Sequence, residues 1–332
     1  MSTLDELHHS LSSVPMEDYP RTSRVHRLKS FDLPDCTVYI KREDELGFGI
    51  SGCKIRKYLS LIPYLLSQKL NEAIVIGAAF SNHVVSITQL LIENQILPVL
   101  FLLGEPPFKV QGNFLFASLL ARPENIHWFS KEKWQNLDPI ANEYVQAKAK
   151  ENVKVGIIPK GGSCRESIPG SLTLALDILR NEKESGIRFD HILIDSGTGM
   201  IAGSVIQAFA YLDSPAHFHV MQIAGDPEEF YLSLNTIQKE FETLLGTKAP
   251  PAKNMTLYQP KNARSFGSVN AKVLRTVKEI ARSEGFFTDP VYTAKLFSEG
   301  RDLLKSGKLK GNILFIHSGG GLALSGFQEH LV

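Results

Sequence analysis

Short apolar segments typical of β-strands alternate along most of this chain with longer segments of helical periodicity. In the first half, we expect strands at 73–76, 99–103 and 126–129, and helices starting at Lys54 and covering 84–93, 112–120 and 138–150. In the second half, we expect strands at 191–195, 217–223 and 312–316, and helices over 171–184, 202–212, 227–245, 269–284 and 292–306. This alternation predicts an α/β fold with open twisted sheets of parallel type, covered by helices.

The length of the chain predicts two units, because 332 residues exceed what a single hydrophobic core usually supports. Residues 1–50 are expected to form an N-terminal arm, irregular as far as about Pro34, and then part of the larger unit. Residues 51–156 are expected to form the smaller α/β unit, and residues 157–332 the larger one.

The balance of charge argues against partners that carry many negative charges. The chain has 36 basic and 35 acidic residues, so no net field favours nucleic acid or an anionic membrane. The most apolar region, 73–103, is interrupted by polar residues such as Ser81, Asn82 and His83. It is therefore expected to form a buried strand–helix–strand segment and not a membrane span.

The three cysteines, Cys36, Cys53 and Cys164, are spaced for neither a disulfide framework nor a zinc site, so no metal is expected. The first residues carry early acids and lack the apolar core of a secretory signal. Both observations favour a reducing compartment, and the cytoplasm is the expected location.

A glycine-containing turn places Lys54 at the start of an apolar-patterned helix. The turn, residues 46–52, follows a strand-like segment, and Tyr58, Leu61 and Leu65 come after it at helical spacing. Backbone N–H groups at a helix start are unpaired and the local potential is positive, which makes a neutral, nucleophilic amine easier to reach. A solvated basic helix start is the plainer alternative.

Four polar loops are expected directly after strands, where open parallel sheets bind ligands. The first, 77–83, contains Ser81, which can cap the next helix, and Asn82 and His83, which capping does not require. The second, 195–203, has glycines before an apolar helix and favours an anion such as phosphate. It also resembles a dinucleotide fingerprint, but no acidic residue ends the next strand.

The third loop, 317–321, could present the Ser318 hydroxyl to a ring nitrogen, or could be only a tight turn. The fourth, 288–293, carries Tyr292 and Thr293, although Pro290 alone accounts for its turn. A lysine at a helix start, a Ser-Asn pair, an anion loop and a Ser-Gly-Gly segment together describe a pocket for a phosphorylated aldehyde. That cofactor is pyridoxal phosphate.

Six motifs, in this order, resemble the D-cysteine desulfhydrase and 1-aminocyclopropane-1-carboxylate deaminase family from about Tyr39 onward. They are Lys41-Arg42-Glu43-Asp44, Gly52-Cys53-Lys54-Ile55-Arg56-Lys57, Phe80-Ser81-Asn82-His83, Gly161-Gly162-Ser163, Asp289-Pro290-Val291-Tyr292 and His317-Ser318-Gly319-Gly320. The resemblance implies the tryptophan-synthase-β type of fold, with pyridoxal phosphate between the domains, and a homodimer.

The resemblance also implies roles for individual residues. Lys54 would be the Schiff-base lysine, Asn82 would bond the ring hydroxyl, Tyr292 would face the ring and Ser318 would face its nitrogen. Lys54, Ser81 and Tyr292 would be the catalytic residues. The phosphate would be held by Gly197, Thr198, Gly199, Met200, Ile201 and Ala202, and the substrate by Ser81, His83, Gly162, Ser163, Phe266 and Thr293.

Four positions depart from the family pattern: Cys53 and Cys164 stand in place of asparagine, Met200 of threonine and Phe266 of tyrosine. Thr293 and Ser318 occupy positions where the deaminase branch has glutamate and leucine. We therefore expect β-elimination from a small amino acid, with D-cysteine giving pyruvate, ammonia and sulfide. The alternatives are 1-aminocyclopropane-1-carboxylate deamination and a non-catalytic module that binds pyridoxal phosphate or an amino acid.

Overall fold

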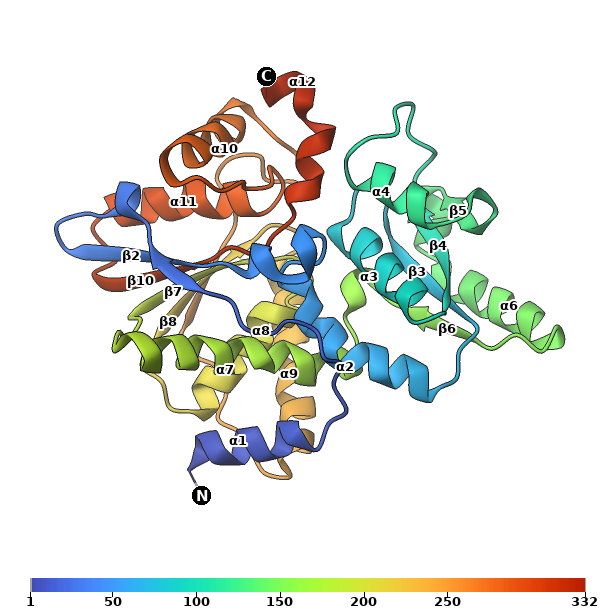
Figure 1. Cartoon of the computed structure of the whole chain (residues 1–332), viewed down its shortest axis with the longest axis horizontal. Helices are drawn as coiled ribbons and strands as arrows, with labels where there is room; N and C mark the ends of the chain where they lie inside the picture. The colour runs from blue at the N-terminus through green and yellow to red at the C-terminus, as the bar shows by residue number, and fades with distance from the viewer. Residues whose placement is uncertain (1, 332) are drawn as a thin grey trace.

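Two helix-covered sheets make up the computed structural model, which describes residues 2–331 (Figure 1). The larger sheet has the order β1-β2-β10-β7-β8-β9, formed by β1 (Val25–Arg27), β2 (Cys36–Lys41), β7 (His191–Ser196), β8 (His217–Gln222), β9 (Met255–Tyr258) and β10 (Gly311–Ile316). The smaller sheet has the order β5-β4-β3-β6, formed by β3 (Glu72–Ala78), β4 (Leu97–Leu103), β5 (Ile126–Phe129) and β6 (Val155–Ile158). Strand β1 pairs antiparallel with β2, and the other neighbouring strands pair parallel. The predicted fold class is confirmed.

Both faces of the larger sheet are buried, because successive side chains of a strand point to opposite faces. In β7, Ile192 and Ile194 belong to the core under α1 (Thr3–Ser12), α7 (Ile168–Ser185), α8 (Met200–Tyr211) and α9 (Pro227–Leu245). Leu193 points to the other face, where it packs with Phe297 beneath α10 (Ala271–Glu284) and α11 (Thr293–Lys305). Figure 1 shows these two helix layers on either side of the sheet.

The smaller sheet is covered in the same way. Val75 and Leu100 pack under α2 (Lys54–Ser67), α3 (Asn82–Glu93) and α4 (Gly112–Leu120). Ile74 and Val99 face α6 (Leu137–Lys150) on the opposite side. Helix α5 (Lys131–Trp134) is a single turn before α6.

The prediction of an irregular segment before Pro34 was wrong. Helix α1 begins with a capping box, in which the Ser2 hydroxyl accepts from the Asp5 N–H at 3.2 Å and the Asp5 carboxylate accepts from the Ser2 N–H at 3.2 Å. Leu7 and Leu11, one helical turn apart, are buried in the larger core. Strand β1 also lies in this segment.

The fourth polar loop, 288–293, follows helix α10 and not a strand. The boundary expected between residues 156 and 157 falls inside β6, which pairs with β3 of the smaller sheet. The division of the chain into units 1–50, 51–156 and 157–332 stays a prediction.

Helix α2 is tied to the larger unit by a buried cluster of four charges from β2, the segment after it, α2 and α7. The Arg56 guanidinium donates to Glu43 Oε1 at 2.7 Å and to Asp177 Oδ2 at 2.8 Å, and Lys41 Nζ donates to Asp177 Oδ2 at 2.6 Å. All four side chains are buried, and their formal charges cancel. Helices α2 and α7 also come very close, since a Cβ at Gly170 would lie 2.0 Å from the Arg56 carbonyl oxygen.

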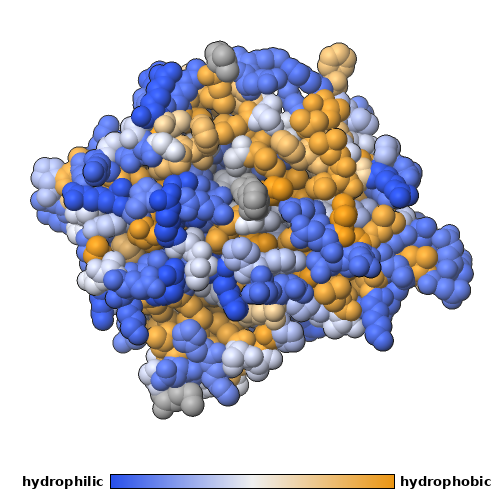
Figure 2. All heavy atoms as spheres, viewed as in Figure 1, coloured by the Kyte–Doolittle hydropathy of each residue, from blue (hydrophilic) through white to orange (hydrophobic). Residues whose placement is uncertain are grey.

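The surface is mixed in character. Figure 2 shows hydrophilic residues interspersed with apolar ones, and apolar residues gathered over α4. Phe108, Val110 and Leu119 are among the exposed large apolar side chains of this region. Within residues 2–331, no helix combines the length and the apolar character that crossing a membrane requires.

Candidate active site

A cavity of about 570 Å³ lies between the two units, at the carboxyl ends of β3 and β7. It brings together twelve of the residues predicted from sequence: Lys54, Ser81, Asn82, His83, Gly197, Thr198, Gly199, Met200, Ile201, Ala202, Phe266 and Tyr292. Gly162, Ser163, Thr293 and Ser318 lie outside its lining. The loops that sequence analysis singled out therefore converge on one site.

Lys54 is the first residue of α2, and the turn before it is held against the last loop of the larger unit. The Cys53 N–H donates to the Ser318 carbonyl oxygen at 3.0 Å, and a Cβ at Gly52 would lie 2.3 Å from that oxygen. Gly52 also has a φ of +53°, so glycine is required there. The Lys54 Nζ lies 5.7 Å from the centre of the Tyr292 ring.

The residues next to Lys54 do not form a solvated basic surface. Arg56 is fully buried in the charge cluster, and Lys57 is buried with its Nζ donating to the Gly161 carbonyl oxygen at 2.9 Å. Burial, and then the nearby Lys54, lower the pKa of Lys57 to about 8. Burial raises the pKa of Cys53 to about 11, so its thiol stays protonated at neutral pH.

Asn82 is held in one orientation by a residue that sequence analysis did not identify. Asn113, from α4, donates its Nδ2 to Asn82 Oδ1 at 2.7 Å and to the Phe80 carbonyl oxygen at 2.9 Å. The Asn82 Nδ2 donor is thereby left for a ligand in the cavity. Ser81 lines the same cavity and also caps α3, since its hydroxyl accepts from the His83 N–H at 3.1 Å.

His83 is a neutral, buried side chain. Burial, followed by the charges of Lys57 and Lys54, holds the pKa of His83 well below its ordinary value. Its Nδ1 lies 2.9 Å from the Tyr58 hydroxyl, while its Nε2 has no hydrogen-bond partner among residues 2–331. The site thus contains a buried, unpaired imidazole nitrogen.

The β7–α8 loop forms an anion cradle. Gly199 is the N-cap of α8 with a φ of +83°, and no side chain caps the helix start. The N–H groups of the first turn, Met200 to Ala202, therefore lack the partner that capping gives elsewhere, and they line the cavity. The Ser163 hydroxyl donates to Thr198 Oγ1 at 2.6 Å, which leaves the Thr198 O–H available to donate to an anion.

The three predicted substrate residues outside the lining contact other parts of the site. Ser163 bonds Thr198, as described above, and a Cβ at Gly162 would lie 3.0 Å from His83 Cε1. Thr293 is fully buried, and its N–H and hydroxyl both bond the Asp289 carboxylate, at 2.7 and 3.0 Å. Thr293 therefore supports the Tyr292 loop, and its role toward the substrate stays a prediction.

Phe266 and Tyr292 form one wall of the cavity. Their rings meet edge to face with centroids 5.9 Å apart, and Phe266 is 45% exposed. Burial, and then the carboxylates of Asp195 and Asp289, raise the pKa of the Tyr292 phenol. The phenol therefore stays protonated at neutral pH and can donate a hydrogen bond.

Ser318 faces Asp195 at the far end of the cavity. Its hydroxyl donates to Asp195 Oδ2 at 3.0 Å, and Asp195, unlike Ser318, lines the cavity. Burial raises the pKa of Asp195 to about 6. Sequence analysis placed Asp195 at a strand end without giving it a role.

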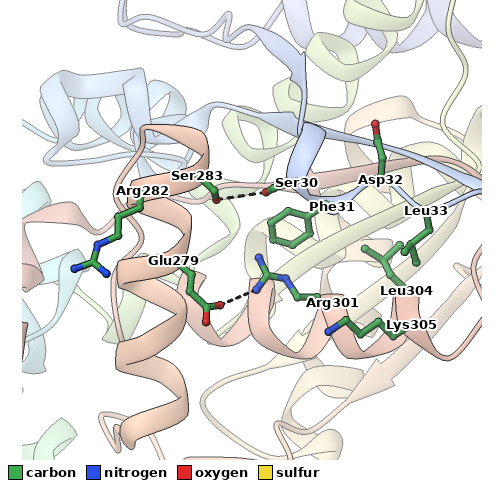
Figure 3. Close-up of a pocket in the computed structure, with 10 residues that line it drawn as sticks. All are labelled: Ser30, Phe31, Asp32, Leu33, Glu279, Arg282, Ser283, Arg301, Leu304 and Lys305. Atoms are coloured by element: carbon green, nitrogen blue, oxygen red, sulfur yellow. Dashed lines mark hydrogen bonds and ion pairs between the residues drawn. The ribbon is translucent and has the colours of Figure 1, made fainter.

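A second cavity, of about 540 Å³, lies between α10, α11 and residues 30–33 (Figure 3). Its Arg301 lies 4.4 Å from the centre of the Phe31 ring and donates to Glu279 at 2.9 Å. The predicted site residues lie elsewhere, so the first cavity is the candidate active site.

The donors of the first cavity fit pyridoxal phosphate. A lysine amine stands at one side, the unpaired N–H groups of α8 suit a phosphate, and the amide donor of Asn82 suits a ring hydroxyl. These three groups come from separate elements and meet in one space large enough for a small cofactor and substrate.

Comparison with known proteins gives the same family. No family model matches the chain. A protein of Pyrococcus abyssi provisionally named a 1-aminocyclopropane-1-carboxylate deaminase is 30% identical over 312 residues, which are 92% of this chain and 89% of that protein. The mitochondrial bifunctional D-cysteine desulfhydrase/1-aminocyclopropane-1-carboxylate deaminase of Arabidopsis thaliana is 30% identical, over 90% of this chain and 76% of that protein. The D-cysteine desulfhydrase of Yersinia pseudotuberculosis is 27% identical, over 98% of this chain and 99% of that protein.

Solved structures support the relationship found from sequence. The crystal structure of a homologue of 1-aminocyclopropane-1-carboxylate deaminase superposes with a TM-score of 0.85 at 26% identity, over 98% of both chains. A pyridoxal 5'-phosphate-dependent aspartate racemase shares the fold, with a TM-score of 0.64 at 12% identity over 96% of this chain and 95% of that chain. The fold and the lengths of chain matched lead to one conclusion: this protein belongs to the 1-aminocyclopropane-1-carboxylate deaminase and D-cysteine desulfhydrase family of pyridoxal phosphate-dependent enzymes.

Proposed function

We propose that this enzyme removes the β-substituent of a small amino acid, with D-cysteine as the first-choice substrate and pyruvate, ammonia and sulfide as products. The observation that carries the proposal is that Lys54, the uncapped start of α8 and the Asn82 amide line one cavity. That arrangement supports covalent attachment of pyridoxal phosphate to Lys54, with its phosphate at α8.

Pyridoxal phosphate, when bound, withdraws electrons from the substrate and so makes its α-proton removable. With the cofactor bound, the Lys54 amine would take that proton as a general base. Lys57, close by and buried, offers a positive charge to the substrate carboxylate. The Tyr292 phenol, whose pKa is raised, stays protonated and can donate a hydrogen bond to the departing thiolate.

The choice between the two family branches rests on Thr293 and Ser318. In the family that this sequence resembles, the deaminase branch has a glutamate and a leucine at these positions. Here both positions hold residues with a neutral hydroxyl. We therefore expect slow release of pyruvate and sulfide from D-cysteine and little turnover of 1-aminocyclopropane-1-carboxylate. Efficient ring opening by the unmodified enzyme would reverse the choice of substrate.

The attachment of the cofactor is tested by reduction. The purified protein with pyridoxal phosphate should be yellow, and borohydride should fix the cofactor to the peptide that contains Lys54. Lys54→Ala is the variant and Lys160→Ala the matched control, because Lys160 also lines the cavity. A label on another lysine, or an unchanged label in Lys54→Ala, would refute the assignment of Lys54.

We also propose a homodimer located in the cytoplasm. The exposed apolar side chains near α4, Phe108, Val110 and Leu119, support self-association. Sedimentation of the purified protein should give twice the mass of the 332-residue chain. A monomer at micromolar concentration would contradict the homodimer.

A further inference from the structure

Asp195 is a buried carboxylate that the mechanism above does not use. It ends β7, immediately before the anion cradle, and lines the cavity. One of its oxygens, Oδ2, accepts the Ser318 hydroxyl at 3.0 Å. The other, Oδ1, is buried and has no hydrogen-bond partner among residues 2–331.

An unpartnered, buried carboxylate oxygen in a ligand cavity calls for a donor from the ligand, because buried polar groups are nearly always hydrogen-bonded. Three other ionisable groups interact with Asp195. The Lys54 ammonium attracts its carboxylate, and the Asp289 carboxylate repels it. The Asp195 carboxylate in turn helps to raise the pKa of the buried Tyr292 phenol. The Asp289 carboxylate is already used by the N–H groups of Tyr292 and Thr293.

Asp195 lines the cavity, whereas Ser318, the residue that the resemblance led us to expect there, does not. The Ser318 side chain does not line the cavity, since its hydroxyl is directed to Asp195 Oδ2. A hydroxyl that donates to a carboxylate fixes that carboxylate in position. The group that Ser318 supports is thus presented to the ligand in its place.

We propose that Asp195 is the residue that pairs with the ring nitrogen of pyridoxal phosphate and keeps a proton on it, with Ser318 positioning the carboxylate. This inference rests on the proposed function. The ring nitrogen would take its proton from solvent water, and the Asp195 Oδ1 atom would accept the resulting N–H, so that the ring cation and the carboxylate anion offset each other. A proton held on the ring strengthens its withdrawal of electrons from the substrate.

The raised pKa of Asp195 is consistent with this pairing, because burial outweighs the attraction of Lys54 and makes the carboxylate a better proton acceptor. A cationic ring would add a counter-charge in direct contact with the carboxylate. The pairing then predicts that the bound ring nitrogen stays protonated above neutral pH.

The direct test uses pyridoxal phosphate labelled with ¹⁵N in the ring, bound to the full chain. The nitrogen chemical shift distinguishes the protonated from the unprotonated ring without any turnover. In the unmodified enzyme it should report a protonated nitrogen at pH 7.5, and in Asp195→Asn an unprotonated one. Ser318→Ala should keep the proton but lower the pH at which it is lost. Glu229→Gln is the matched control, because Glu229 also lines the cavity, and it should leave the shift unchanged.

A second measurement uses a cofactor analogue in which carbon replaces the ring nitrogen. The unmodified enzyme should bind this analogue about tenfold more weakly than pyridoxal phosphate, or worse, because a hydrogen bond to a charged group is lost. In Asp195→Asn the preference for pyridoxal phosphate over the analogue should shrink to about threefold or less.

The outcomes separate the two proposals. If the unmodified protein fails to attach pyridoxal phosphate at Lys54, the proposed function fails and this inference fails with it. If attachment is normal but the nitrogen is unprotonated, or remains equally protonated in Asp195→Asn, the inference alone is overturned. An unprotonated nitrogen in the unmodified enzyme overturns the inference even if Asp195→Asn does not fold.

Discussion

Replacing Arg56 with methionine tests the buried charge cluster directly, because methionine keeps an unbranched apolar stem and removes the charge. The guanidinium donates to Glu43, to Asp177, to the Arg21 carbonyl oxygen at 3.1 Å and to Thr173 Oγ1 at 3.2 Å. Without it, Glu43 keeps only the Lys41 ammonium, at 3.9 Å, as a counter-charge, while Asp177 keeps Lys41 and the partly exposed Arg180. Removing one partner of a buried ion pair typically costs ~3–5 kcal/mol, and we expect Arg56→Met to lower the free energy of unfolding by that amount.

A double variant distinguishes the loss of charge pairing from a simple packing defect. Glu43→Gln combined with Arg56→Met restores charge balance and leaves the Lys41–Asp177 pair intact at 2.6 Å. The double variant should therefore be more stable than the sum of the two single changes by about 0.5–3 kcal/mol. Urea unfolding followed by circular dichroism gives the free energy of unfolding of the unmodified protein, the two single variants and the double variant.

Glu184→Gln is the matched control for the Arg56 experiment. It breaks an ion pair with Arg180 on the surface of α7, where both side chains are exposed, and it should cost about 0.5 kcal/mol or less. A loss below ~1 kcal/mol in Arg56→Met, or strict additivity with Glu43→Gln, would refute the account of the cluster.

Three further predictions concern pH, cofactor retention and rate. Burial lowers the pKa of His219 from 6.5 to about 3, so the unfolded chain binds its proton first and stability falls as the pH drops below 6.5. Between pH 7.5 and pH 5 the His219 contribution to this loss should be ~2 kcal/mol, and His219→Gln should reduce the pH dependence of the free energy of unfolding in urea over that range; an unchanged slope would contradict it. Met200→Thr should slow the loss of pyridoxal phosphate during dialysis, because it adds one hydroxyl at the anion cradle, worth about 1 kcal/mol; equal or faster loss would count against the cradle. Phe266→Tyr should raise pyruvate release from D-cysteine, since it adds a phenol to the cavity wall, and an unchanged or lower rate would show that this position takes no part in proton transfer.

The parts of the fold that follow local patterns were predictable from the sequence. The run of strands and helices from Lys54 to Ile316 rests on hydrophobic periodicity, which each segment carries by itself. Helix α1 was missed although Ser2 and Asp5 form a capping box, because only two apolar residues, Leu7 and Leu11, mark its buried side. The short strand β9 was missed because four half-buried residues give too brief a pattern.

The contacts that complete the site depend on tertiary structure and leave no mark in the local sequence. Asn113 reaches Asn82 from a helix 31 positions away, and Ser318 reaches Asp195 across 123 positions. The resemblance implies a substrate role for Thr293, and no local pattern reveals the contacts that its backbone and hydroxyl make. Only the fold shows that it bonds Asp289.

The close approach of α2 and α7 at Gly170 has a consequence for the dimensions of the site. Lys54 begins α2, whereas the anion cradle belongs to the larger unit, so the separation of these helices sets the distance across which cofactor and lysine must meet. A methyl group at position 170 would meet the Arg56 carbonyl oxygen, and relieving that overlap would require the helices to move apart. The span available to the cofactor is thus set by a backbone contact outside the cavity, where a substitution would change the fit of the ligand without altering any residue that touches it.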